Sequence, residues 1–256
     1  MISNKAIFSA LRQGGVGMAL AHLSGRVFGI SKFLRPASTI DFRKSQLKSA
    51  KSAQEFISLL LTNNQDIDSA IEIAKKLVNQ NVSQSTENLK EPARWNSGIE
   101  LQYILTTLVI LTKPEVVVET GTANGASAAA ILTGLEYNKS GHLWSFDIKP
   151  ANPLLVADEL KKRATFVRVN GEESDLIKHL KDIKNSNKGF SLFLHDADHS
   201  FIGQQSDYKL AKRFGFDLIL SDDIDASLAF CEFAKGQGVT LYDAPKFIGA
   251  VRNSDL

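Results

Sequence analysis

Acidic and histidine side chains cluster after two short apolar runs, where their types and spacing could support chemistry. Residues 194–201 read Leu-His-Asp-Ala-Asp-His-Ser-Phe, and residues 220–225 read Leu-Ser-Asp-Asp-Ile-Asp. A hydrophobic core cannot hold such groups without partners, because burying an unpaired charge is costly. The two segments are therefore candidates for a binding or catalytic site, and the alternative is a salt-bridged polar patch without a metal.

Asp196, Asp222 and Asp223 are the candidate metal ligands in these segments. If the two apolar runs are neighbouring strands, Asp196 faces the other two carboxylates. Carboxylates so placed repel one another, and a divalent cation is the usual way to hold several together. Ligation by oxygen alone favours Mg²⁺, Mn²⁺ or Ca²⁺ over zinc, and we expect Mg²⁺. Histidine side chains ordinarily titrate near neutrality, so His199 is a candidate general base, or else a structural histidine.

A third candidate is the segment Val116–Ala128, Val-Val-Val-Glu-Thr-Gly-Thr-Ala-Asn-Gly-Ala-Ser-Ala. A β-branched run ends in Glu119, and Gly121 and Gly125 follow before a helix of small residues. Glycines just past a buried strand let the backbone turn tightly and approach a ligand, and the next helix N-terminus offers free N–H donors. Ser127 could bond a carboxylate held there. An ordinary strand–turn–helix is the alternative.

These segments need a scaffold, and the chain from Trp95 onward alternates between helix-like and strand-like stretches. This alternation predicts a doubly wound α/β sheet, whose ligands bind at the carboxyl ends of the strands. The predicted strands are Val116–Glu119, Leu143–Asp147, Thr165–Val169, Ser191–His195, Leu218–Ser221, Val239–Tyr242 and Phe247–Val251, the last two forming a terminal antiparallel hairpin. The predicted helices are Ile99–Leu111, Ala126–Leu135, Leu154–Lys162, Leu176–Ile183, Gln205–Arg213 and Leu228–Lys235.

The glycine loop resembles the first motif of class I S-adenosylmethionine (SAM) methyltransferases, whose sheet has seven strands and ends in an antiparallel hairpin. In that family the glycines admit the methionine part of SAM. The resemblance implies cofactor contacts from Glu119 and from Gly121 to Ser127, including Thr122, Asn124 and Gly125. Asp147, at the end of the second strand, would accept the ribose hydroxyls. A dinucleotide enzyme would use such an acid too, and it could simply cap a turn.

The Asp-Ala-Asp-His-Ser segment, followed about 25 residues later by Asp-Asp, resembles the metal-dependent O-methyltransferases of the catechol and sugar-modifying types. The resemblance implies that Asp196, Asp222 and Asp223 are metal ligands. The catechol type has a lysine where this chain has His199, and usually an asparagine in the second pair. The sugar type has the histidine as its proposed base, so a sugar or another small diol is the expected acceptor.

In the same family, the end of the third strand approaches the adenine ring, which makes Gly171, Glu173 and Ser174 candidates here. Ser174 could equally be a helix N-cap. The resemblance covers residues 95–256, the expected methyltransferase domain. Residues 1–94 are expected to be a helical extension that packs on this domain or on a second subunit, and the alternative is a basic amphipathic segment at a membrane surface. Amphipathic helices are predicted within Ile7–Leu34, Ala50–Leu61 and Ile67–Val78, followed by a polar linker.

Composition restricts the partners and the compartment. The 256 residues carry 30 basic and 28 acidic side chains, a net charge of +2 that gives no argument for nucleic acid. The single cysteine, Cys231, excludes an intramolecular disulfide, so a reducing, cytoplasmic location is expected. No signal peptide or spanning segment is predicted. A homodimer is plausible because the extension is apolar.

The sequence thus predicts a SAM-dependent O-methyltransferase acting on a small molecule or sugar with Mg²⁺ and His199. Three alternatives remain: a metal-independent methyltransferase, a nicotinamide-dependent oxidoreductase, and a SAM-binding protein without turnover. The glycine spacing and the terminal hairpin argue against the oxidoreductase.

Overall fold

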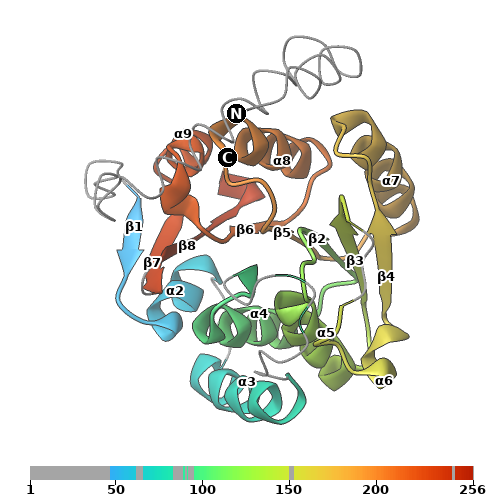
Figure 1. Ribbon diagram of the computed structural model, residues 1–256. Helices are drawn as coiled ribbons and strands as arrows, with labels where there is room; N and C mark the ends of the chain where they lie inside the picture. The colour runs from blue at the N-terminus through green and yellow to red at the C-terminus, as the bar shows by residue number, and fades with distance from the viewer. Residues whose placement is uncertain are drawn as a thin grey trace.

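A mixed eight-stranded sheet with helices on both faces forms the fold in the computed structural model (Figure 1). The structure describes residues 47–61, 66–82, 89, 91, 95–149, 153–243 and 246–255. The strands are β1 (Lys48–Ala50), β2 (Val116–Thr120), β3 (His142–Asp147), β4 (Ala164–Arg168), β5 (Ser191–His195), β6 (Leu218–Ser221), β7 (Val239–Asp243) and β8 (Lys246–Arg252). The helices are α2 (Ala53–Leu60), α3 (Ile67–Asn81), α4 (Ile99–Thr112), α5 (Ala126–Asn138), α6 (Asp158–Lys161), α7 (Glu173–Ser186), α8 (Phe201–Arg213) and α9 (Ala229–Ala234), with short 3₁₀ turns at Ile224–Ala226 and Asn253–Asp255.

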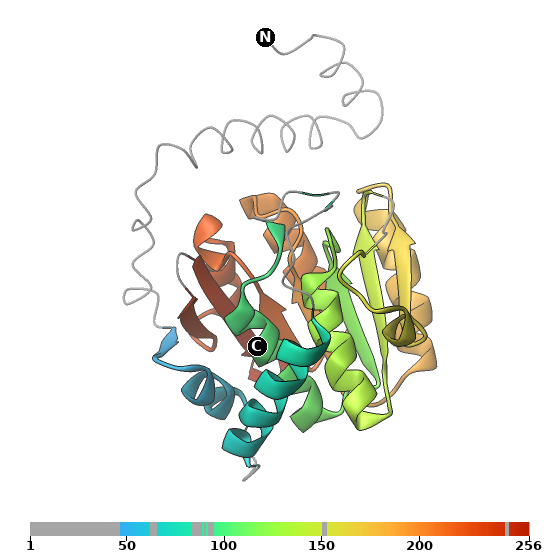
Figure 2. The same ribbon diagram turned by 60° about the horizontal axis from the view of Figure 1, so that its bottom comes forward.

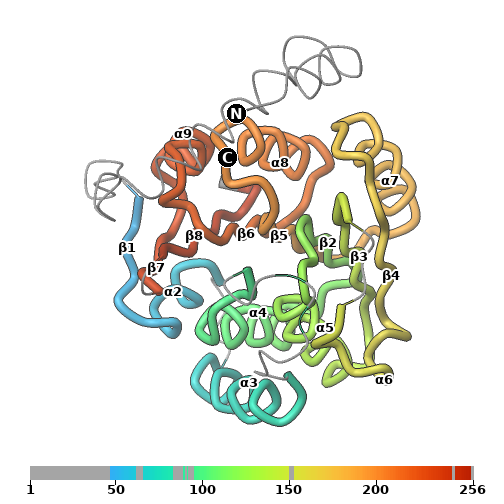
Figure 3. The backbone as a smooth tube through the Cα atoms, viewed as in Figure 1, coloured from blue at the N-terminus to red at the C-terminus, as the bar shows by residue number. Residues whose placement is uncertain are grey.

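The order of the strands across the sheet is β1-β7-β8-β6-β5-β2-β3-β4, which Figure 3 shows as a row across the molecule. Only β8 is antiparallel to its neighbours, β6 and β7. The doubly wound sheet and its terminal hairpin are therefore confirmed. Because β8 alone runs backwards, its first residue lies at the edge where the other strands end.

Two hydrophobic layers cover the sheet, since successive residues of a strand point to opposite faces. Val117 packs in a cluster with α2, α4 and α5, whereas Val116 and Val118 pack with α7, α8 and α9. Figure 2 shows the first group of helices in front of the sheet and the second group behind it. The β-branched run of β2 is buried on both faces, as expected for a central parallel strand.

Helices α4 and α5 pack closely because small residues line their contact. A Cβ on Gly134 of α5 would meet Val109 of α4 at 2.8 Å. The Thr106 hydroxyl of α4 donates a hydrogen bond of 2.8 Å to the Ala130 carbonyl. The close packing of α4 against α5 fixes the position of α5, whose N-terminus follows the loop at the end of β2.

Strand β1 was not predicted from the sequence, because it lies in the segment predicted to be helical. Lys48–Ala50 pairs in parallel with Val239–Leu241 of β7, so the sheet has eight strands rather than seven. The predicted helix within Ala50–Leu61 begins only at Ala53, capped by the Ser52 side chain. The predicted helix Ile67–Val78 is present and extends to Asn81, packing Ala70 and Ala74 against α4. The predicted helix within Ile7–Leu34 lies outside the described residues.

The predicted helix Leu154–Lys162 is also wrong over its first half, because only Asp158–Lys161 is helical. The Leu155 N–H donates to the Asn124 carbonyl, and the Val156 N–H closes a turn on the Pro153 carbonyl. One bond ties the segment to the loop after β2 and the other closes a turn within it, so the helix begins only at Asp158. Across the described parts of the chain, no helix combines the length and hydropathy needed to cross a membrane.

Candidate functional site

The loop after β2 turns at Gly121, which has a φ of +91°. Its N–H donates to the Phe146 carbonyl at 2.7 Å. A Cβ at this position would lie 2.0 Å from the carbonyl oxygen of Asp196, just after β5. Only glycine fits such a contact and such a φ. The glycine loop and the acidic segment after β5 therefore touch through their backbones.

The second half of the loop is anchored on two sides. Gly125 has a φ of +89°, and a Cβ there would meet the Pro153 side chain at 2.5 Å. The Asn124 amide donates to the Glu91 carbonyl at 3.0 Å and to Asn96 Oδ1 at 2.9 Å, and its oxygen accepts from the Glu91 N–H. Asn124 thus ties the segment before α4 to the predicted cofactor loop.

Glu119 is fully buried at the end of β2 and accepts two short hydrogen bonds. Ser127 Oγ donates to one carboxylate oxygen and Ser145 Oγ to the other, each at 2.5 Å. Thr122 shares a hydroxyl contact of 2.7 Å with Ser145. Burial raises the pKa of Glu119 to about 7, against the two serine bonds that favour the charged form. The Ser127 hydroxyl, predicted to bond the cofactor carboxylate, therefore donates its hydrogen bond to Glu119 in this structure.

Asp147, predicted to bind ribose, holds the tip of the same loop. Its Oδ2 accepts the N–H groups of Thr122 and Ala123 at 2.9 and 3.0 Å. Its Oδ1 accepts the Lys149 N–H at 2.9 Å. A carboxylate offers about four acceptor sites, so three backbone bonds leave capacity for a hydroxyl.

The candidates after β4 lie at the start of α7. Gly171 has a φ of +83°, with Ile148 at 3.4 Å from where a Cβ would be. Glu173 accepts a hydrogen bond of 3.0 Å from Ser206 of α8, which braces α7 against α8. The N-cap of α7 is Glu172, so Ser174 lies inside the helix and the N-cap alternative for it is wrong.

At the end of β5, the fully buried His195 joins a small network that the sequence did not indicate. Asp207 of α8 accepts hydrogen bonds at 2.7 Å from His195 Nδ1 and from the Thr120 hydroxyl. His195 Nε2 is buried without a hydrogen-bond partner in the described part of the chain. The ring packs 5.6 Å from that of His199, edge to face. His195 therefore braces the loop that carries His199.

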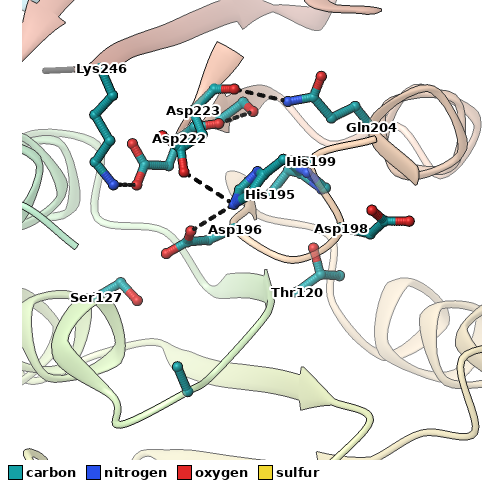
Figure 4. A network of polar contacts seen from close by, with 12 residues as sticks. Thr120, Ser127, His195, Asp196, Asp198, His199, Gln204, Asp222, Asp223 and Lys246 are labelled. Carbon is teal, nitrogen blue, oxygen red and sulfur yellow. Dashed lines mark hydrogen bonds and ion pairs between the residues drawn. The ribbon is translucent and has the colours of Figure 1, made fainter. Parts of the chain in front are cut away.

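His199 lies between two carboxylates (Figure 4). Its Nε2 is 3.3 Å from Asp223 Oδ2 and 3.9 Å from Asp196 Oδ1. The His199 side chain is 19% exposed, so it is reachable from solvent. Asp223 adopts a left-handed φ of +49°, and its carbonyl accepts a bond from Gln204 Nε2 at 3.2 Å. The two polar segments predicted from the sequence are thus brought together.

The third carboxylate, Asp222, is fully buried and forms an ion pair with Lys246, the first residue of β8. Figure 4 shows Lys246 reaching the aspartates from the side opposite the histidines. Burial and the nearby Asp222 carboxylate raise the pKa of Asp196 well above its ordinary value, and Lys246 counteracts this. Burial likewise raises the pKa of Asp222 to about 6, with Lys246 opposing it.

The same residues bear on the predicted metal. Asp222 Oδ1 is buried without a hydrogen-bond partner within the described residues, as a ligand atom could be. Its other oxygen, however, is taken by Lys246. No group of three His, Cys, Asp or Glu side chains in the ranges that the structure describes is arranged to hold a metal ion. As arranged here, the three aspartates do not fit a divalent cation.

Lys246, Asp207 and Gln204 are the site residues that sequence reasoning missed. Lys246 is placed by the antiparallel direction of β8, which the predicted hairpin already implied. Gln204 and Asp207 follow the His199 segment on α8, at a spacing that turns both toward the strand ends.

Comparison with known proteins adds a family match. Residues 118–215 match the family described as "Methyltransferase domain". A search of curated proteins found no significant match. Two similar solved structures are an S-adenosylhomocysteine (SAH)-bound methyltransferase, PaMTH1, from Podospora anserina and an O-methyltransferase from Bacillus cereus in complex with SAH. The first is 14% identical with a TM-score of 0.42, over 72% of this chain and 87% of the other; the second is 13% identical with a TM-score of 0.41, over 79% and 97%.

Proposed function

We propose that the chain is a SAM-dependent methyltransferase that methylates a hydroxyl group of a small-molecule or sugar acceptor. The match of residues 118–215 to a methyltransferase-domain family supports this proposal. The observation that carries this proposal is the position of His199. It lies between Asp196 and Asp223, and the Asp196 backbone touches Gly121 of the loop predicted to bind SAM. A base and a methyl donor would thus share one edge of the sheet.

For the cofactor, we propose that SAM lies along the ends of β2, β3 and β4. The free acceptor site of Asp147 suits a ribose hydroxyl. Ser127 has one proton and gives it to Glu119, so the predicted bond from Ser127 to the SAM carboxylate would require that contact to break. The SAM ammonium group only donates hydrogen bonds, so it is a better partner than the SAM carboxylate for the Glu119–Ser127 pair.

In the proposed reaction, His199 removes the proton of the acceptor hydroxyl. The oxygen attacks the methyl carbon in line, the new C–O bond forms, and the C–S bond breaks to leave neutral SAH. The resulting imidazolium is stabilised by the two carboxylates beside it and returns its proton to solvent. Most of the acceleration comes from holding donor and acceptor in line.

A His199→Gln variant tests this assignment, with His179→Gln as a control outside the site. We expect SAH to bind both variants as it binds the wild type in a calorimetric titration. Methyl transfer from labelled SAM to a panel of sugars and catechols should fall by about 10²–10⁴-fold in His199→Gln only, the usual contribution of a general base. Full turnover by His199→Gln would rule out its role as the base.

The predicted Mg²⁺ at Asp196, Asp222 and Asp223 stays a prediction, and no step above uses it. We propose the metal-independent reaction as the first candidate, because the Lys246–Asp222 ion pair already occupies one of the three carboxylates. Turnover that survives a chelator would support this candidate, whereas turnover restored only by Mg²⁺ would support the metal.

A further inference from the structure

Lys246 reaches the acidic cluster because of the sheet topology. We call Asp196, Asp222 and Asp223 the acidic cluster. Every other strand ends at the edge where these residues lie, whereas β8 begins there. A cation at the first position of β8 is thereby delivered to carboxylates that follow β5 and β6.

The ion pair with Asp222 is mostly shielded from water. The Asp222 side chain is 1% exposed and that of Lys246 is 19% exposed. A lysine side chain is cationic at neutral pH, so the pair places a positive charge against the buried Asp222 carboxylate.

The cluster also needs such a charge. The side chains of Asp196, Asp222 and Asp223 are 11%, 1% and 24% exposed, so three carboxylates share a largely buried place. Removing a counter-ion from buried carboxylates leaves uncompensated charge, which is strongly destabilising. A protein can supply that charge with a bound divalent cation or with its own side chain.

We propose that Lys246 is the built-in counter-ion of the acidic cluster and takes the place of a divalent cation there. This proposal rests on the proposed methyltransferase function, since it assigns to this site a methyl transfer that needs no metal ion. It predicts that the wild-type protein does not bind a divalent cation at the cluster, and that removing the lysine charge creates a site that does.

The test is Mn²⁺ binding by the metal-stripped full chain. Binding is measured by calorimetry and by the loss of the paramagnetic resonance signal of free Mn²⁺. Four proteins are compared: the wild type, Lys246→Met, Lys246→Arg, and Lys76→Met as a control at an exposed lysine on α3. We expect no stoichiometric binding by the wild type, by Lys246→Arg or by Lys76→Met. Lys246→Met should bind one Mn²⁺ at least about tenfold more tightly, because ligand charge sets the affinity of such sites.

Thermal melting gives a second readout. Lys246→Met should melt below the wild type, and Mn²⁺ should recover part of the loss, whereas the arginine variant should need no metal. If Lys246→Met does not fold, the double variant Asp222→Asn with Lys246→Met removes both partners and is expected to fold without binding Mn²⁺. Stoichiometric Mn²⁺ binding by the wild type that Asp222→Asn abolishes would overturn the proposal.

SAH titration of the same samples separates this proposal from the proposed function. If the wild type fails to bind SAH, the methyltransferase proposal fails while the Mn²⁺ result still decides the role of Lys246. If SAH binds and Mn²⁺ binds the wild type as well, only the counter-ion proposal fails.

Discussion

Replacing Gly121 by alanine is the sharpest perturbation of the contact between the two halves of the site. Two costs add. A non-glycine residue in the left-handed region costs about 1–2 kcal/mol. The new Cβ would also lie 2.0 Å from the Asp196 carbonyl oxygen, far inside the 3.4 Å at which ordinary contacts begin, and neither backbone can move aside cheaply. Overpacking of this kind costs about 1–3 kcal/mol.

Gly215→Ala is the matched control. Gly215 also has a positive φ, +64°, but an added Cβ meets nothing within 4 Å among the described residues. Gly215→Ala is therefore destabilised only by the positive φ, without a steric clash. At about 2–4 °C per kcal/mol for a chain of this size, we expect Gly121→Ala to lower the melting temperature by roughly 10 °C and Gly215→Ala by about 4 °C.

The assay is thermal unfolding of both variants with and without SAH. Because the clash displaces the loop proposed to bind the cofactor, Gly121→Ala should also lose the stabilisation that SAH gives to the wild type and to Gly215→Ala. Equal melting temperatures for the two variants, or full SAH stabilisation of Gly121→Ala, would refute the argument that the Asp196 backbone shapes this loop.

Two further predictions concern buried polar groups. Burial raises the pKa of Glu119 from 4.5 to about 7, so the folded state holds its proton more tightly, and the stability this gives is lost as the pH rises through 7. The free energy of unfolding should fall by about 3 kcal/mol between pH 4.5 and 8, and Glu119→Gln should abolish most of that slope in urea titrations. Asp207→Ala leaves His195 and the Thr120 hydroxyl without their acceptor, and should cost about 3 kcal/mol by urea unfolding at pH 7. A cost below about 1 kcal/mol would mean that water replaces the carboxylate.

Most of the sheet is predictable because its strands are apolar runs that end in polar residues. Val116–Val118 is buried on both faces, and such a run is recognisable without a structure. β1 is not recognisable in this way, since Lys-Ser-Ala has no β-branched or large apolar residue. It is a strand only because β7 offers it hydrogen bonds, and that is a tertiary effect.

The candidate site also has a part that the sequence predicts and a part that depends on tertiary packing. The meeting of His199 with Asp196 and Asp223 follows from the rule that parallel strands end at one edge, so the sequence was enough to expect it. The partners of individual atoms were not predictable. That Ser127 donates to Glu119, and that Asp222 is paired with Lys246, depends on side-chain positions set by packing within about 1 Å.

The three residues of β1 also act as a cover. A strand at the side of a sheet presents a row of unpaired N–H and C=O groups to any other chain in solution, and proteins often blunt such sides with short, charged segments. Lys48–Ala50 occupies that row on β7, and Lys48 and Ser49 are exposed. A shortened protein that began at Trp95, the predicted start of the methyltransferase domain, would keep every candidate site residue but leave the flank of β7 bare. That protein would also lose the core side chains of α2 and the Glu91 partner of Asn124, so self-association through β7 would accompany a loosened core and a loosened cofactor loop.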